Sequence, residues 1–223
     1  MARNGKRYRV ANESIDRQRT YPVEEGVKLL KGLPPAKFDE TVEIAVRVVL
    51  KGNQTVRDTM VLPHSFEQEQ RILVFAEGDK AKEAEEAGAS YVGGQDLIDK
   101  IKDGWVDFDV TVATPEMMRG DGRLGPILGR RGLMPNPKTR TVTQDVAGTV
   151  AELKRGRVEF RADRAGVVHL AIGKLSMDEA ALTENARSVV EEVERKRPAE
   201  VKGEFLRSVA VSTTMSPSVK VEM

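Results

Sequence analysis

Alternating apolar and polar side chains predict a long strand near the amino terminus. Apolar residues recur at every second position from Val42 to Leu50, with Phe38 in the same phase. The opposite phase holds small or polar residues: Thr41, Glu43, Ala45 and Arg47. A strand with this pattern has one buried and one exposed face. The run TVRDTMVL at 55–62 follows a turn at 51–53, so the pattern favours an antiparallel hairpin.

Apolar residues that recur every three to four positions predict one helix before the middle of the chain and one after it. The first covers 23–33 and is bounded by prolines. The second is longer, and Ser176 and Glu179 have the spacing of a capping box at its start. One face of this second helix is apolar: Leu182, Ala186, Val189, Val190 and Val193.

The middle of the chain alternates between short apolar runs and segments of helical spacing. The apolar runs lie at 71–76, 91–94 and 107–113, and the helical segments at 80–87, 95–101 and 146–153. Strands that alternate with helices imply a parallel sheet covered on both faces. Beyond Gly156, strand alternation returns at 157–162, 167–173 and 204–214, with a turn at 163–166.

This order of elements predicts an α/β and α+β protein of two domains. A discontinuous α+β domain would comprise 1–67 and 158–223, and an α/β domain would be inserted at 68–157. The two crossings, near 66–70 and 154–157, would form the hinge between them.

The segment 113–143 interrupts all of these patterns. It contains five glycines and four prolines, and its six Lys/Arg against two acidic residues give 6 − 2 = +4. Gly permits positive φ and Pro ends helices, so the segment can be neither one long helix nor a strand. Its methionines and leucines argue against disorder. We interpret it as a shaped, basic surface.

Composition restricts the possible settings of the protein. The 223 residues include no cysteine, which excludes disulfides and thiol chemistry. No run approaches the roughly 18 apolar residues of a membrane helix, and the first ten residues lack the apolar core of a secretory signal. We therefore expect a cytoplasmic protein without membrane contact.

Charge is segregated along the chain, although the formal net charge is only +1. Residues 1–20 carry six Lys/Arg against two acids, and 77–109 carry ten acids against four lysines. The acidic run is interpreted as a solvated face. The basic runs favour a polyanionic partner over the alternative of simple solvation.

Signals for an enzyme or a metal site are weak. Gly120, Gly122 and Gly125 satisfy G-x-G-x-x-G, but six residues separate them from the preceding strand, unlike a dinucleotide fingerprint. The two histidines lie far apart in sequence, so no zinc site is expected. Asp107 and Asp109 alternate with an aromatic residue and fit strand-edge acids. We expect no enzyme, cofactor or metal.

Several blocks resemble a known family. The sequence GRRGLMPNPKTRTVT, preceded by TPEMMR, resembles the signature of the bacterial ribosomal protein L-one family, the family of the large-subunit stalk protein. Further similar blocks lie in family order along nearly the whole chain: AKFDETVEIAV, VRDTMVLPH, EEAGASYVGG, GWVDFDVTVATPEMM, VEFRADRAGVVHLAIGK and SVAVSTTMSPSV. The resemblance implies a discontinuous first domain and an inserted, Rossmann-like three-layer α/β domain.

The resemblance also implies a set of RNA contacts. Positions that match those the family uses against rRNA are Lys37, Phe38, Thr41, Glu43, Ser208, Thr214 and Met215. Asp163, Arg164 and His169 are added because their turn and strand lie next to this surface, and Thr213, Ser216 and Pro217 complete the expected rRNA-binding set. Residues expected to face tRNA or the stalk tip are Arg119, Arg123, Arg130, Arg131, Lys138 and Arg140. Without the resemblance, the Ser/Thr group near 208–214 would be a polar outer face, Phe38 would be a core residue and His169 a half-buried one.

Function follows as an expectation from the same resemblance. The chain would be a structural component of the large ribosomal subunit that binds stalk rRNA, assists release of deacylated tRNA from the exit site and represses translation of its own operon mRNA. It would act as a monomer within the ribosome. Two alternatives from other classes remain: a Rossmann-type nucleotide-binding enzyme, and a protein–protein adaptor that uses the acidic helices of 77–109.

The chain departs from the family pattern at a few positions. Ser216 and Ser218 flank the proline where the family commonly has Gly-Pro-Gly, and Arg130 and Arg140 add charge to the signature. Asp58 replaces a usual glycine, and the turn at 51–53 is short. These differences concern individual contacts.

Overall fold

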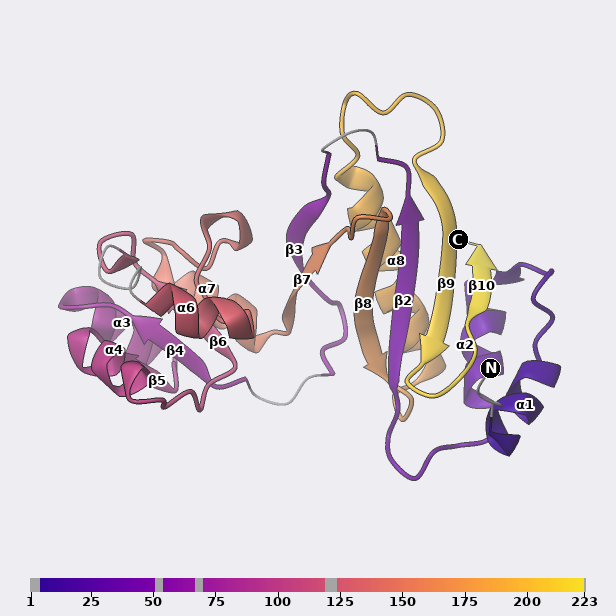
Figure 1. Cartoon of the computed structure of the whole chain (residues 1–223), viewed down its shortest axis with the longest axis horizontal. Coiled ribbons are helices and arrows are strands. Elements are labelled where there is room, and N and C mark those ends of the chain that lie inside the picture. Colours follow the sequence, from indigo (N-terminus) through magenta and orange to yellow (C-terminus); the bar gives the residue numbers. More distant parts are fainter. Residues whose placement is uncertain (1–4, 51–53, 67–69, 119–123, 223) are drawn as a thin grey trace. The chain divides into compact units, whose positions relative to one another are not determined.

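The computed structural model describes residues 5–50, 54–66, 70–118 and 124–222. Two compact units make up the chain, Met1–Phe66 with Glu159–Met223 (unit 1) and Glu67–Val158 (unit 2). The mixed α/β class expected from the sequence is confirmed (Figure 1). Within the described ranges, no helix combines the length and apolar character that a membrane span needs.

Unit 1 is built on a five-stranded sheet with the order β1-β10-β9-β2-β8. These strands are β1 (Tyr21–Pro22), β10 (Val219–Glu222), β9 (Leu206–Thr213), β2 (Thr41–Val48) and β8 (Val167–Lys174). The neighbours are antiparallel except for the parallel pair β1 and β10. Helices α2 (Val23–Lys31) and α8 (Glu179–Arg195) pack against one face (Figure 1).

The helix layer is held by the apolar stripes that the sequence predicts. Every residue predicted for the apolar face of α8 is buried: Leu182, Ala186, Val189, Val190 and Val193. Helix α2 approaches β10 so closely that a Cβ on Gly26 would lie 2.5 Å from Val221 Cγ1. The predicted capping box is wrong, because α8 begins after Asp178 and the Ser176 hydroxyl donates to Asp39 instead.

The predicted hairpin is also wrong. Strand β2 is central and pairs with β8 and β9, whereas β3 (Arg57–Val61) forms a separate two-stranded sheet with β7 (Arg157–Arg161). Both edges of β2 are occupied by strands from the other end of the chain, which leaves no edge for β3. The turn at 51–53 lies outside the described residues.

Three elements of unit 1 were not expected from the sequence. Helix α1 (Lys6–Glu13) forms within the basic amino-terminal segment, and its Ala11 is buried. The two-residue β1 and the short β10 complete the sheet beyond β9. Both strands are too short for an alternating pattern to stand out.

Unit 2 contains a three-stranded parallel sheet with the order β5-β4-β6. Its strands are β4 (Ile72–Phe75), β5 (Tyr91–Gly93) and β6 (Val110–Ala113), and its longer helices are α3 (Asp79–Glu86), α4 (Gln95–Lys102) and α7 (Val146–Lys154). One apolar cluster joins Leu73 and Phe75 to α4, and a second joins Ile72 and Val74 to α7. The parallel sheet is thus buried on both faces, as predicted.

Residues 124–140 of the segment 113–143 form short turns of helix, and the described residues of the segment contain no long helix, in agreement with the prediction. These are α6 (Gly125–Leu128), η2 (Gly129–Arg131) and η3 (Pro137–Thr139). Its apolar side chains pack on the core, with Leu124 and Leu128 fully buried. Arg140 has a positive φ of 53°, which ends η3.

Candidate nucleic-acid interface

The face of the unit 1 sheet opposite α2 and α8, here called the open face, carries small and polar side chains. On β2 the exposed or half-buried residues are those of the phase predicted from the sequence: Thr41, Glu43, Ala45 and Arg47. Glu43 lies between Ala171 and Ser212 on the neighbouring strands, and Ala45 lies between His169 and Ala210. The neighbours of β2 at the centre of the open face are therefore mostly small, with Glu43 and His169 as the larger exposed side chains.

The buried carboxylate of Glu40 organises one end of the open face. Its Oε1 accepts from the Ala36 amide at 3.1 Å, and its Oε2 accepts from the Thr213 hydroxyl at 2.6 Å and the Met215 amide at 2.9 Å. Arg7 lies 3.7 Å from Oε1. One side chain thus joins the loop before β2 to the loop after β9.

The pKa of the Glu40 carboxyl reflects this environment. Burial alone would raise that pKa, but the hydrogen bonds from the Thr213 hydroxyl and the Met215 and Ala36 amides, together with Arg7, hold it below its usual value. The carboxylate therefore stays ionised at neutral pH. A charge with these partners fixes the shape of both loops.

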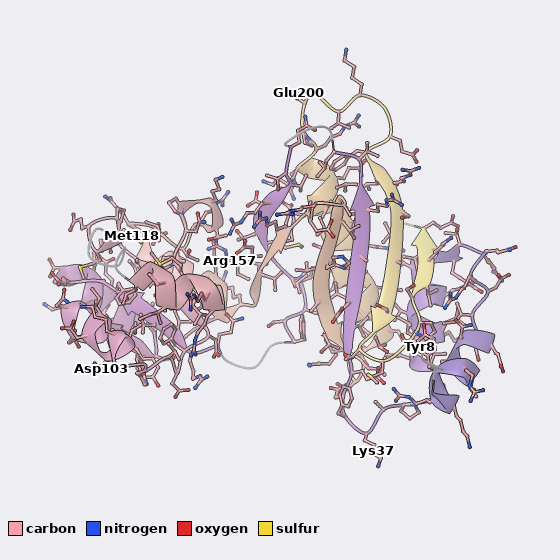
Figure 2. All side chains as sticks on the ribbon, in the orientation of Figure 1. Tyr8, Lys37, Asp103, Met118, Arg157 and Glu200 are labelled. Atoms are coloured by element: carbon pink, nitrogen blue, oxygen red, sulfur yellow. The ribbon has the colours of Figure 1, made fainter. Side chains whose placement is uncertain are left out.

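The two joined loops present large side chains to solvent. Phe38 is 55% exposed and Met215 is 52% exposed, so the core position considered for Phe38 is excluded. Lys37 points away from the sheet at this end, and Glu200 lies in the loop at the opposite end (Figure 2). Exposed apolar groups beside a lysine are suited to stacking on bases next to a phosphate backbone.

Hydroxyl groups at the same end are held in defined positions. The Thr41 amide donates to the Thr214 hydroxyl at 3.1 Å, and Lys174 Nζ donates to the Thr41 hydroxyl at 2.8 Å. Thr214 remains exposed on the surface. These groups retain hydrogen-bonding capacity toward a ligand.

Three of the candidate residues at this end are partly or fully buried and have structural roles, with Thr213 and Pro217 buried and Ser216 half-buried. Thr213 is 6% exposed and its hydroxyl is bound to Glu40. The Ser216 hydroxyl accepts from the Thr213 amide at 2.8 Å and donates to the Pro217 carbonyl at 3.0 Å, and Pro217 is buried. Their role in the structure is to shape the turn that presents Thr214 and Met215.

A second group of candidates lies at the other end of the open face. The Asp163 carboxylate accepts from the Ala165 and Val167 amides, both at 2.8 Å, and lies 4.0 Å from His169 Nε2. The Val167 amide is the main cause that lowers the pKa of Asp163. His169 is 64% exposed at its side chain, which excludes the half-buried alternative.

Asp163, Arg164 and Ser208 lie about the length of β2 from the first group, and His169 lies between them, opposite Ala45. Eight residues at roughly 3.3 Å per residue give about 25 Å. Arg164 and Ser208, both exposed, belong to the second group, since Ser208 pairs with Arg47 at the end of β2. The structure therefore brings the candidates together along one extended face, which fits a folded polymer better than a small molecule.

Glu40 and Lys174 are the positioning residues that sequence reasoning missed. Glu40 has the phase of the buried residues Val42 and Ile44, so a carboxylate there must find partners. That conflict between charge and phase was the available signal. No comparable signal in the sequence marks Lys174, because its contact with Thr41 depends on the pairing of β2 with β8.

Candidate residues of unit 2 lie in the segment 113–143. The four described ones are exposed: Arg130, Arg131, Lys138 and Arg140. Arg119 and Arg123 lie outside the described residues. The η3 turn is fixed by the Asn136 carboxamide, which accepts from the Lys138 amide at 2.9 Å, and by the buried Arg157 guanidinium, which donates to the Thr139 carbonyl.

The residues considered for catalysis or metal binding have structural partners. Asp107 and Asp109 both pair with Arg71, so they are strand-edge acids as interpreted. His64 contacts Glu184 at 2.8 Å, whereas His169 lies 4.0 Å from Asp163, so the two histidines have different partners. In the described part of the chain, no three His, Cys, Asp or Glu residues form a metal-binding group. Of the three glycines, Gly120 and Gly122 lie outside the described residues.

Comparisons with known proteins identify the family. The sequence model described as "Ribosomal protein L1p/L10e family" matches residues 29–217. The chain is 54% identical over 222 residues to the large ribosomal subunit protein uL1 of Borrelia duttonii, covering 100% of this chain and 99% of the relative. It is 53% identical over 220 residues to the protein of the same name from Treponema denticola, covering 99% and 97%. The chain thus belongs to the Ribosomal protein L1p/L10e family, whose members are structural components of the ribosome and not enzymes.

Proposed function

We propose that this protein binds the rRNA of the large-subunit stalk through the open face of unit 1. Unit 1 would be the rRNA-binding domain, and unit 2 an inserted, Rossmann-like domain. The relatives are named as proteins of the large ribosomal subunit. The observation that carries the proposal is the pair of loops joined by Glu40, which present Phe38 and Met215 at one end of a polar sheet.

The chemistry of the open face supports recognition of folded RNA. RNA is distinguished from DNA by its 2′-hydroxyls, and unpaired bases stack on exposed apolar side chains. Glu43 is exposed and repels phosphate, but it can accept hydrogen bonds from ribose hydroxyls or base amino groups. A face with few cations at its centre suits shape and hydroxyl readout more than bulk charge attraction.

Two further functions belong to this proposal. Unit 2 would direct its basic residues Arg130, Arg131, Lys138 and Arg140 toward the exit-site tRNA or the stalk tip and assist release of deacylated tRNA. Unit 1 would also bind a copy of the same RNA shape in the messenger of its own operon and repress its translation. Both extensions use surfaces that are exposed in the structure.

Filter binding of the full chain to a stalk rRNA fragment and to an unrelated duplex, at low and moderate salt, tests the proposal. We expect tight, selective binding with a shallow salt dependence. Phe38→Ala should weaken binding by about tenfold, since stacking on one base contributes roughly 1–3 kcal/mol. Thr214→Ala should weaken it by up to about tenfold, since one lost hydrogen bond contributes about 0.5–1.5 kcal/mol. Lys28→Gln, on the helix layer, is the control. Equal, steeply salt-dependent binding to both RNAs would contradict the proposal.

A further inference from the structure

Four arginines surround a recess at the end of the open face where β2 ends. This arginine recess has a volume of about 900 Å³ and is lined by Arg47, Arg161, Arg164 and Arg207. All four side chains are exposed. They come from four segments: the end of β2, the end of β7, the turn at 163–166 and the start of β9.

A β-bulge directs one of these arginines into the recess. Arg47 pairs with Ser208 and Val48 pairs with Leu206, so Arg207 is the extra residue on β9. In a regular strand, Arg207 would have the phase of the buried residue Val209 and point toward the helices. The bulge reverses this direction, a common use of bulges near binding sites.

One side of the recess is held by close contact between the turn at 163–166 and the end of β2. Gly166 has a φ of 75°, and a Cβ at this position would lie 2.6 Å from the Val48 carbonyl oxygen. The Val48 amide donates to the Gly166 carbonyl at 2.7 Å. The turn that carries Arg164 is therefore fixed against the end of β2.

Nearby carboxylates do not neutralise these cations. Asp163 also lines the recess, but its oxygens are bound to the amides of its own turn and face His169. Glu159, two residues before Arg161, pairs with Arg57 at 2.6 Å. In the described ranges, none of the four lining arginines is within ion-pair distance of a carboxylate, so the lining has a formal charge of 4 − 1 = +3.

We propose that the arginine recess binds successive backbone phosphates of an RNA strand that continues from the open face. This inference rests on the proposed function and adds Arg47, Arg161 and Arg207 to the interface. Guanidinium groups bind phosphate oxygens through paired N–H donors. Cations spread around so large a recess suit several linked phosphates better than one free anion. Continuity with the open face follows from the register, because Arg47 pairs with Ser208.

The test measures the salt dependence of binding for the full chain and a stalk rRNA fragment. Arg161→Gln/Arg207→Gln should weaken binding at least about tenfold and reduce the salt slope by about 1.5, since each neutralised phosphate contributes roughly 0.7–0.9. Arg161→Lys/Arg207→Lys should retain most of the slope. Lys28→Gln/Arg195→Gln makes the same change in charge on the helix layer and should change neither quantity. Circular dichroism melting confirms that each variant is folded.

The possible results separate this inference from the proposed function. If the unsubstituted chain binds selectively and Arg161→Gln/Arg207→Gln leaves the salt slope unchanged, the phosphate-binding role of the recess is overturned and the proposed function stands. Absence of selective binding by the unsubstituted chain would overturn both. Calorimetry with inorganic phosphate at constant ionic strength is expected to give no saturable heat, and saturable heat that disappears in Arg161→Gln/Arg207→Gln would mean a small-anion site instead.

Discussion

The replacement of Glu40 by glutamine tests whether one buried carboxylate holds the binding end of unit 1 together. The side chain is 4% exposed and accepts hydrogen bonds at both oxygens. Glutamine has a similar shape but only one acceptor oxygen. Its best orientation keeps that oxygen at the Thr213 and Met215 donors and turns the amide nitrogen toward the Ala36 amide.

The structure allows the cost of Glu40→Gln to be worked out. The half-buried Ala36 amide loses its acceptor, which costs about 1–2 kcal/mol, the lower part of the range for a fully buried donor. The two remaining bonds lose their charge assistance, about 0.5–1 kcal/mol each. The free energy of unfolding of unit 1 should therefore fall by about 2–4 kcal/mol.

Urea unfolding followed by two signals measures this change. The single tryptophan, Trp105, lies in unit 2, so its fluorescence reports on unit 2 and serves as an internal control. We expect Glu40→Gln to lower the circular dichroism transition assigned to unit 1 and to leave the fluorescence transition unchanged. Glu222→Gln, at an exposed position, should change neither. Midpoints equal to those of the unsubstituted chain would refute the role assigned to Glu40.

The pH dependence of stability gives a second readout of the same carboxylate. Because the folded state lowers the pKa of Glu40, its contribution to stability is present above the ordinary value of about 4.5 and is lost as the pH falls through the lower folded-state pKa. Glu40→Gln has no carboxyl group to titrate at this position. The difference in stability between the two proteins should therefore shrink as the solution is made more acidic than pH 4.5.

Two other substitutions test further structural contacts. Gly166→Ala should destabilise unit 1 by about 2 kcal/mol or more, because the residue has a positive φ and its Cβ would meet a β2 carbonyl at 2.6 Å. Gly203 also has a positive φ, but a Cβ there would have no atom within 4 Å, so Gly203→Ala should reduce the stability of unit 1 by less. Equal melting temperatures for the two variants would contradict the steric argument. Arg157→Gln should lower the unfolding free energy of unit 2 by about 2–4 kcal/mol, since it removes a buried cation that binds the η3 carbonyl and Glu152. Tryptophan fluorescence measures this loss, with the exposed Arg155→Gln as control; equal midpoints would show that Arg157 does not hold the turn.

The spacing of apolar residues predicted the helices and strands of this protein more reliably than it predicted which strands pair with one another. The α8 face and the alternation in β2 follow from side chains that repeat over several turns or several residue pairs. The pairing of β2 with β8 and β9 could not be predicted in this way, because strands from distant parts of the chain compete for the same edges. A local hairpin was the nearest alternative, and it is wrong.

The sequence by itself determined the family, the mixed α/β class, the exposed phase of β2 and the irregular, basic character of 113–143. These properties depend on local composition and on residue order. Only the tertiary structure decided that Glu40 joins two loops 173–175 residues apart, that Thr213 faces inward, and that a bulge turns Arg207 outward. Each of these depends on register between strands distant in sequence, and a shift of one residue reverses the direction of every side chain.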